Sequence, residues 1–290
     1  RRKTKSTHIK IVLEEIKLFH DDPERHVYEL IEQALYKPPF NEGIIGSAKT
    51  VNSLTREKIV HIFEEKYSPE NFIVVVVGKA NIKKICERLE KDFNSQKKSY
   101  SYLPIENHHQ NIVEERAGID QAQFIWATHA PLEQKKQYSL EIINAYLTGG
   151  MSAKLWLEIR EKHGLAYTVR GSIEREKNYS YYSIYVGTTK EAVPKIKDMI
   201  IQGIKDVEEM TIRDLAEAKQ RLIGLRRVAT EESINAMQKL IFTEISTSNA
   251  HEYYEYEKHL DEITLEEVKL LAKSLLKEYS TATILPKNGN

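Results

Sequence analysis

Two hydrophobic periods alternate along this chain of 290 residues. Apolar residues at the 3.6-residue spacing of an amphipathic helix are followed by short apolar runs of strand length. The helical spacing predicts helices at residues 9–36, from 53 onward, and at 82–93, 138–147, 153–162, 192–207, 211–227, 233–244 and 264–277. The short runs predict strands at 72–78, 123–127, 167–173, 181–186 and 281–285. Helices and strands mixed in this order predict an α+β fold.

The first helical pattern contains a break at Asp21-Asp22-Pro23. Proline is well placed in the first turn of a helix, and an aspartate just before it can accept hydrogen bonds from the free backbone N–H groups. We therefore expect one helix to end here and a second to begin.

Two short segments of the chain resemble each other, and we call this internal similarity the echo. Residues 54–59 begin a helix that leads through Tyr67-Ser68 into the valine-rich run, and residues 263–268 begin one that leads through Tyr279-Ser280 into the last strand. The echo predicts two related units, each with helices packed on a mainly antiparallel sheet. Residues 1–95 form the incomplete end of the first unit, 96–110 a linker, and 111–290 the second. The counterpart of the second unit's start would lie about a hundred residues before Arg1.

Charge and composition exclude several classes of protein. The 43 basic residues balance 43 acidic ones, which argues against a nucleic-acid-binding protein. No apolar run approaches the roughly 20 residues of a membrane span, and no apolar signal segment follows the basic start, which favours a cytoplasmic location. The single cysteine, Cys86, excludes an intrachain disulfide and a multi-thiolate metal site, and we expect it to be buried on a helix face.

The most informative stretch covers residues 155–169, which read as the end of a helix, a glycine stop at Gly164 and the start of a strand. Arg160 lies in the last helical turn and Tyr167 at the entry to the strand, seven positions later. A corner of this kind can bring both side chains to one side of a cleft. In a purely structural interpretation, Arg160 caps a helix and Tyr167 is a half-buried strand residue.

Together with Gly149-Gly150-Met151-Ser152, this stretch resembles the C-terminal domain of the M16 zinc metallopeptidases, the pitrilysin, insulinase and processing-peptidase family. The resemblance continues through residues 11–16 and 21–23, and through 37–46, 54–55 and 67–71, in the family's order. It implies that Arg160 and Tyr167 bind the substrate backbone and that Glu15 is the third zinc ligand. The family's second glutamate, seven positions before this ligand, is replaced by His8. Glu15 could otherwise be a surface glutamate beside Glu14.

The family's inverted zinc motif, His-x-x-Glu-His, does not occur in these residues. Its two histidines bind Zn²⁺ from one face of a helix, and its glutamate takes a proton from the metal-bound water. His20 and His26 are six positions apart, which is poor helical ligand spacing, and the adjacent His108 and His109 are better explained as a solvated linker pair. In the family the motif precedes the equivalent of Glu15 by several tens of residues.

Three functions remain open at this point. The chain is part of a zinc-dependent M16 endopeptidase whose motif lies outside it, so that Zn²⁺ is the cofactor and the chain alone is inactive. Alternatively, it is a non-catalytic subunit that binds peptide, or a scaffold subunit. The resemblance implies a peptide or unfolded-protein substrate and a homo- or hetero-dimer of M16-type subunits, with no nucleic acid or membrane partner.

Overall fold

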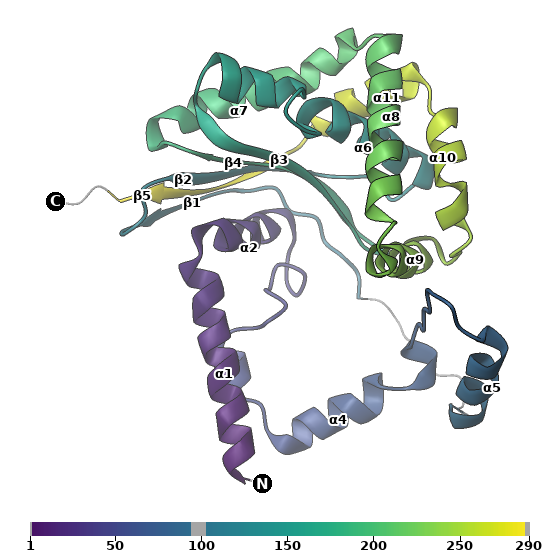
Figure 1. Ribbon diagram of the computed structural model, residues 1–290. Coiled ribbons are helices and arrows are strands. Elements are labelled where there is room, and N and C mark those ends of the chain that lie inside the picture. The colour runs from purple at the N-terminus through teal and green to yellow at the C-terminus, as the bar shows by residue number, and fades with distance from the viewer. Residues whose placement is uncertain (1, 94–102, 288–290) are drawn as a thin grey trace.

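The computed structural model describes residues 2–93 and 103–287, and one five-stranded sheet organises them. Its strands are β1 (Asn111–Arg116), β2 (Ala122–His129), β3 (Ala166–Arg175), β4 (Ser180–Thr188) and β5 (Ser280–Pro286), in the order β1-β5-β2-β4-β3. Only the β1–β5 pair is parallel, and the other three pairs are antiparallel. The predicted α+β class is therefore confirmed, with helices packed on a mainly antiparallel sheet (Figure 1).

One face of the sheet is covered by helices that follow β2 in the chain. They are α6 (Gln134–Thr148), α7 (Val193–Lys205), α8 (Ile212–Ala229), α9 (Ser233–Thr247), α10 (Glu252–Glu262) and α11 (Leu265–Leu275), with short 3₁₀ turns at Lys190–Ala192 and Asp206–Glu209. Successive strand residues point to opposite faces, so Phe124 and Trp126 of β2 enter the core on this side.

Within residues 2–93 and 103–287, one helix covers the opposite face: α2 (Pro23–Leu35), which packs across β2 and β5 (Figure 1). Val27 and Ile31 of this helix are fully buried in a cluster with Ile125 and Ala127 of β2. The central strands are therefore apolar on both faces, which explains why β4 is buried along its whole length. This packing ties a helix from the predicted first unit to the sheet of the predicted second unit, and the unit boundaries stay predictions.

The remaining helices of the first block extend away from the sheet (Figure 1). They are α1 (Arg2–Asp21), α3 (Ala48–Asn52), α4 (Arg56–Lys66) and α5 (Ile82–Asp92), with a 3₁₀ turn at Pro69–Asn71. The predicted strand at 72–78 is wrong for this structure: no described strand pairs with it, and Val74 is 58% exposed. Cys86 is likewise exposed rather than buried, because nothing in the described chain covers that face of α5.

Three other elements, α3, β1 and α10, were not anticipated. α3 is only five residues long, β1 has two adjacent apolar residues followed by three charged ones, and α10 is rich in tyrosine and charge, so none of them has a strong hydrophobic period. The echo is confirmed where it concerns helix starts, since Thr55 caps α4 and Thr264 caps α11 through their side-chain oxygens.

Residues 96–102 of the predicted linker lie outside the described residues. None of the described helices is both long and apolar enough to cross a membrane.

Candidate functional site

The predicted corner between helix and strand brings Arg160 and Tyr167 together. Arg160 lies in a π-helix, η2 (Trp156–Lys162), Gly164 reverses the chain in the left-handed region at φ +59°, and β3 begins at Ala166. The guanidinium carbon of Arg160 lies 4.6 Å from the ring centroid of Tyr167 and 4.5 Å from that of Trp156. The two predicted site residues therefore share one surface.

Both residues lie on irregular backbone. In the π-helix an extra residue is accommodated per turn, a feature that is frequent at functional sites. The register of β3 against β4 shifts between Ala166 and Thr168, so that Tyr167 is the extra residue of a β-bulge. Bulges redirect side chains and occur often beside active sites. Here the bulge leaves Tyr167 76% exposed.

The donors of this pair remain available. The phenol of Tyr167 makes no hydrogen bond to another described residue, and Arg160 has only a long contact of 3.7 Å between its Nε and Glu161 Oε1. An arginine carries five N–H donors and a tyrosine one O–H. The corner can therefore donate several hydrogen bonds to a ligand that carries carbonyl oxygens.

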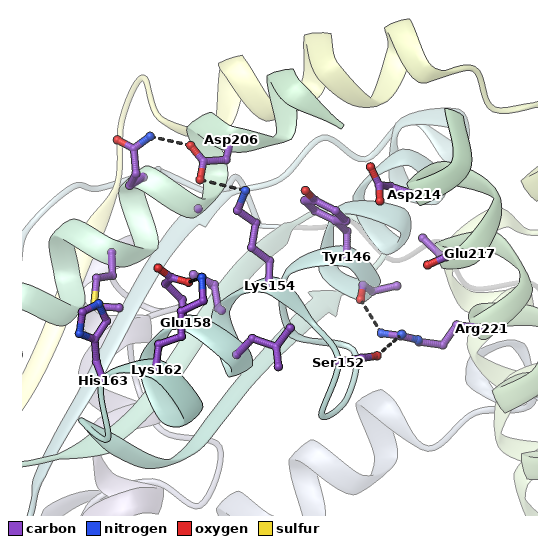
Figure 2. Close-up of a pocket in the computed structure, with 17 residues that line it drawn as sticks. Tyr146, Ser152, Lys154, Glu158, Lys162, His163, Asp206, Asp214, Glu217 and Arg221 are labelled. Carbon is purple, nitrogen blue, oxygen red and sulfur yellow. Dashed lines mark hydrogen bonds and ion pairs between the residues drawn. The ribbon is translucent and has the colours of Figure 1, made fainter. Parts of the chain in front are cut away.

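A cavity of about 630 Å³ lies behind the π-helix, between α6, α7 and α8 (Figure 2). Within it, Lys154 Nζ lies 2.9 Å from Asp206 Oδ2, and Arg221 donates to Ser152 Oγ at 2.6 Å. Burial opposes the charge of Lys154, but the hydrogen bond to Asp206 and the negative charges of Asp206 and Tyr146 together raise the pKa of the lysine. Lys154 and Arg221 therefore both have polar partners inside the protein.

Glu15, the predicted zinc ligand, lies on the exposed side of α1. It has no hydrogen bond or ion pair with Arg160 or Tyr167 among the described residues, and it is not part of a set of three metal-ligating side chains there. A catalytic zinc usually has three protein ligands. The described residues therefore do not fit a complete catalytic zinc site around Glu15.

The structure corrects the interpretation of two histidines. His20 and His26 were rejected as a pair because six positions is poor spacing on one helix, yet their ring centroids lie 4.6 Å apart. The reason is the break at Asp22, whose side chain accepts hydrogen bonds from Glu24 N–H and Arg25 N–H and begins a new helix. The sequence signal was available, because Asp21-Asp22-Pro23 lies between the two histidines. Together with Glu114 of β1 they form a cluster of potential metal ligands.

Known structures share this architecture. A protease from Helicobacter pylori superposes with a TM-score of 0.87 at 19% identity, over 99% of this chain and 72% of that chain. A chain in the structure of complex III2 from Candida albicans superposes with a TM-score of 0.86 at 12% identity, over 96% of this chain and 70% of that chain. At these identities the likeness defines the fold, which is that of M16-like peptidases.

The chain belongs to the M16 peptidase family. The model of the family described as the Peptidase M16 inactive domain matches residues 53–222, more than half of the chain. An uncharacterized zinc protease of Mycobacterium leprae is 25% identical over 291 residues, covering 95% of this chain and 65% of the relative. The chain therefore spans about two thirds of the length of that relative.

Proposed function

We propose that this chain supplies the peptide-binding side of an M16-type zinc endopeptidase. The corner formed by Arg160, whose side chain is 31% exposed, and the exposed Tyr167 carries this assignment, since two hydrogen-bond donors without strong internal partners lie together on irregular backbone. A helix-capping arginine would donate to a helix carbonyl, and a half-buried strand tyrosine would be less exposed than Tyr167, which is 76% exposed.

An extended peptide is the substrate that the corner fits best. β3 is the last strand of the sheet order, and no described strand pairs with its outer edge. A peptide can add to such an edge through main-chain hydrogen bonds. Arg160 would then donate to a peptide carbonyl, and Tyr167 would donate to the oxyanion that develops as the carbonyl is attacked. Both act by positioning and by stabilising charge.

A hydrolytic centre needs more metal ligands than Glu15 alone. We propose that the family's His-x-x-Glu-His motif lies in a segment outside these 290 residues, that Glu15 joins it as a ligand, and that the chain alone does not hydrolyse peptides. In the same proposal, residues 1–95 belong to the N-terminal M16 domain and 111–290 form the C-terminal one. The name of the M. leprae relative, a zinc protease, supports zinc as the cofactor.

A second function is favoured by two observations. The matching family model describes an inactive domain, and one structural neighbour lies in the C. albicans complex III2. A non-catalytic peptide-binding or scaffold subunit of a dimer of M16-type subunits would fit both. Arg160 and Tyr167 favour peptide binding over a pure scaffold, because a scaffold has no need for two adjacent donors without strong internal partners.

Zinc content and peptide hydrolysis measured side by side would test the enzymatic function. We expect the full-length protein to hydrolyse an unstructured peptide in a chelator-sensitive way, and Glu15→Gln to lower both zinc content and turnover. Glu14→Gln, the neighbouring exposed glutamate, is the matched control and should leave both unchanged. A full-length protein that binds peptide but never hydrolyses it would favour the non-catalytic subunit.

A further inference from the structure

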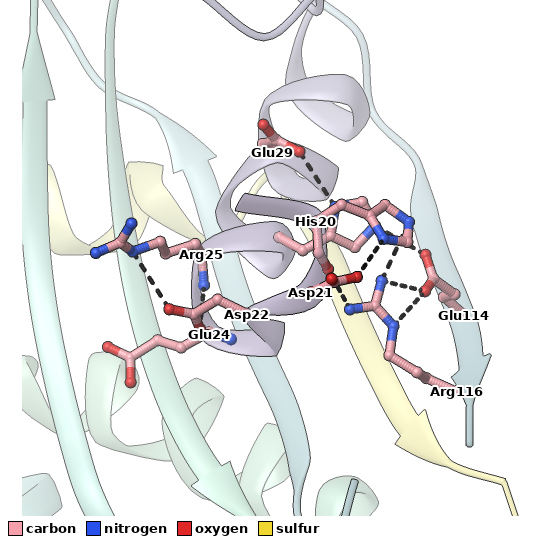
Figure 3. A network of polar contacts seen from close by, with 9 residues as sticks. His20, Asp21, Asp22, Glu24, Arg25, Glu29, Glu114 and Arg116 are labelled. Carbon is pink, nitrogen blue, oxygen red and sulfur yellow. Dashed lines mark hydrogen bonds and ion pairs between the residues drawn. The ribbon is translucent and has the colours of Figure 1, made fainter. Parts of the chain in front are cut away.

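A second cluster of potential metal ligands lies where α1 turns into α2, apart from the peptide-binding corner (Figure 3). One ring nitrogen each from His20 and His26 and one carboxylate oxygen of Glu114 all lie within 4.8 Å of one another. His20 lies in the last turn of α1, His26 in the first turns of α2, and Glu114 on β1. Three segments of the chain therefore converge on one point.

His26 occupies an unusual electrostatic position. Its side chain is 9% exposed, with Nδ1 3.1 Å from Glu29 Oε2 and Nε2 2.9 Å from Glu114 Oε2. A neutral imidazole has one N–H and can donate to only one of these carboxylates. If Nδ1–H donates to Glu29, the lone pair of Nε2 faces the carboxylate of Glu114. Either a second proton on His26 or a cation between Nε2 and Glu114 removes this repulsion.

We propose that His20, His26 and Glu114 bind a divalent transition metal of the zinc class. Two imidazoles and one carboxylate form a ligand set that Zn²⁺ accepts in proteins, and imidazole also suits Co²⁺ and Ni²⁺. Glu29 supplies the outer contact that metal-bound histidines commonly make, because it accepts from the ring nitrogen that does not face the metal. A water molecule completes the coordination.

Arg116 binds one carboxylate oxygen of Glu114 and leaves the other available to a metal ion. Its Nε and Nη2 lie 3.1 Å and 2.8 Å from Glu114 Oε1, so Oε2 remains directed toward His26. Arg116 also lies 3.4 Å from the Nε2 of His20 and donates to the His20 carbonyl. Metal binding requires the His20 ring to turn from Arg116 toward Glu114. This costs little, because the His20 side chain is 58% exposed.

The charges nearby favour a divalent cation. With both histidines neutral, Glu29 and Glu114 carry two negative charges against one positive charge on Arg116. Asp21, whose Oδ1 lies 3.8 Å from His20 Nδ1, adds a third negative charge. A divalent metal therefore brings the cluster to neutrality. The bound ion would fix the turn between α1 and α2 to β1. Its first ligand, His20, lies five residues after Glu15. The role of this ion is structural.

Metal titration of the 290-residue chain tests this site independently of the proposed peptidase. After removal of bound metal, we expect one equivalent of Co²⁺ to bind with the visible absorption of a histidine-ligated ion, and Zn²⁺ to displace it and raise the Tm. His20→Ala and Glu114→Gln should each weaken binding by about tenfold or more. His61→Ala is the control, because His61 faces Glu65 at 4.0 Å on α4 and is 80% exposed.

His20→Ala decides the question, because that side chain is 58% exposed and we expect circular dichroism to show an unchanged fold in this variant. The absence of saturable binding, or unchanged affinity in His20→Ala, would overturn the site and assign His26 to a protonated bridge between two carboxylates. Loss of binding in Glu15→Gln alone would also overturn it, because the metal would then lie at the family position. Unchanged affinity in Glu15→Gln separates this site from the proposed catalytic one.

Discussion

Removing the donors of the Arg160–Tyr167 corner should slow peptide hydrolysis without unfolding the protein. In the full-length enzyme, we expect Tyr167→Phe and Arg160→Ala each to lower kcat by about 10²-fold or more, because a donor aimed at a developing oxyanion typically contributes that much. A 10²-fold loss corresponds to about 2.7 kcal/mol of transition-state stabilisation. Zinc content should be unchanged.

The same two substitutions should lower the free energy of unfolding by much less than they lower transition-state stabilisation. The Tyr167 hydroxyl is exposed and has no internal hydrogen bond among the described residues, so its removal should change the free energy of unfolding by less than about 0.5 kcal/mol. The Arg160 guanidinium stacks 4.5 Å and 4.6 Å from two ring centroids. Exposed cation–π contacts are worth about 0.5–1 kcal/mol each, so Arg160→Ala should cost up to about 2 kcal/mol.

Steady-state kinetics with saturating peptide, run beside thermal melts, separates the two effects. Arg213→Ala and Tyr254→Phe are matched controls, since Arg213 is 86% exposed in a helical ion pair and Tyr254 is 69% exposed. Both should retain kcat. Near wild-type kcat in Tyr167→Phe and Arg160→Ala, with a lowered Tm, would refute the substrate-binding role and favour the scaffold subunit.

Two further predictions concern the core and its pH dependence. Gly171→Ala should lower stability by about 1–3 kcal/mol in a denaturant titration, because a Cβ there would lie 2.1 Å from Asn144 Oδ1 and 2.4 Å from Thr148 Oγ1; an unchanged midpoint would show that this contact relaxes freely. Burial raises the pKa of Glu141, although the hydrogen bond that Tyr256 donates to it acts in the opposite direction. The contribution of protonated Glu141 to stability is therefore complete below about pH 4.5 and is lost as the pH rises through the raised pKa of Glu141. Glu141→Gln should therefore flatten the fall of Tm with rising pH, and an identical pH profile would contradict this.

Much of the fold could be predicted because its signals are local. The capped starts at Thr55 and Thr264, the break at Asp22 and the buried run that became β2 each depend on a few neighbouring residues. The strand predicted at 72–78 failed for the opposite reason. A strand needs a partner, and no sequence window contains the information that none of the described strands pairs with it.

The candidate site divides in the same way. The proximity of Arg160 and Tyr167 could be predicted because a helix, a glycine and a strand follow one another within a few residues. The cluster of His20, His26 and Glu114 was not, because its third member comes from a strand 88 residues beyond His26. Two features bring its members together: the change of helix direction at Asp22 and the packing of α2 on the sheet. The second feature is a long-range contact that no local pattern contains.

The β-bulge connects the sequence pattern to the exposure of Tyr167. In a regular strand, residues two apart share a face, yet the buried residues at the start of β3 are Ala166 and Val169, three positions apart. The extra residue allows both to enter the core while Tyr167 and the following Thr168 stay out of it. Without the bulge, keeping Val169 buried would turn Tyr167 toward the core and away from Arg160. The three-residue spacing between the apolar residues Ala166 and Val169 is therefore the sequence feature that places Tyr167 beside Arg160.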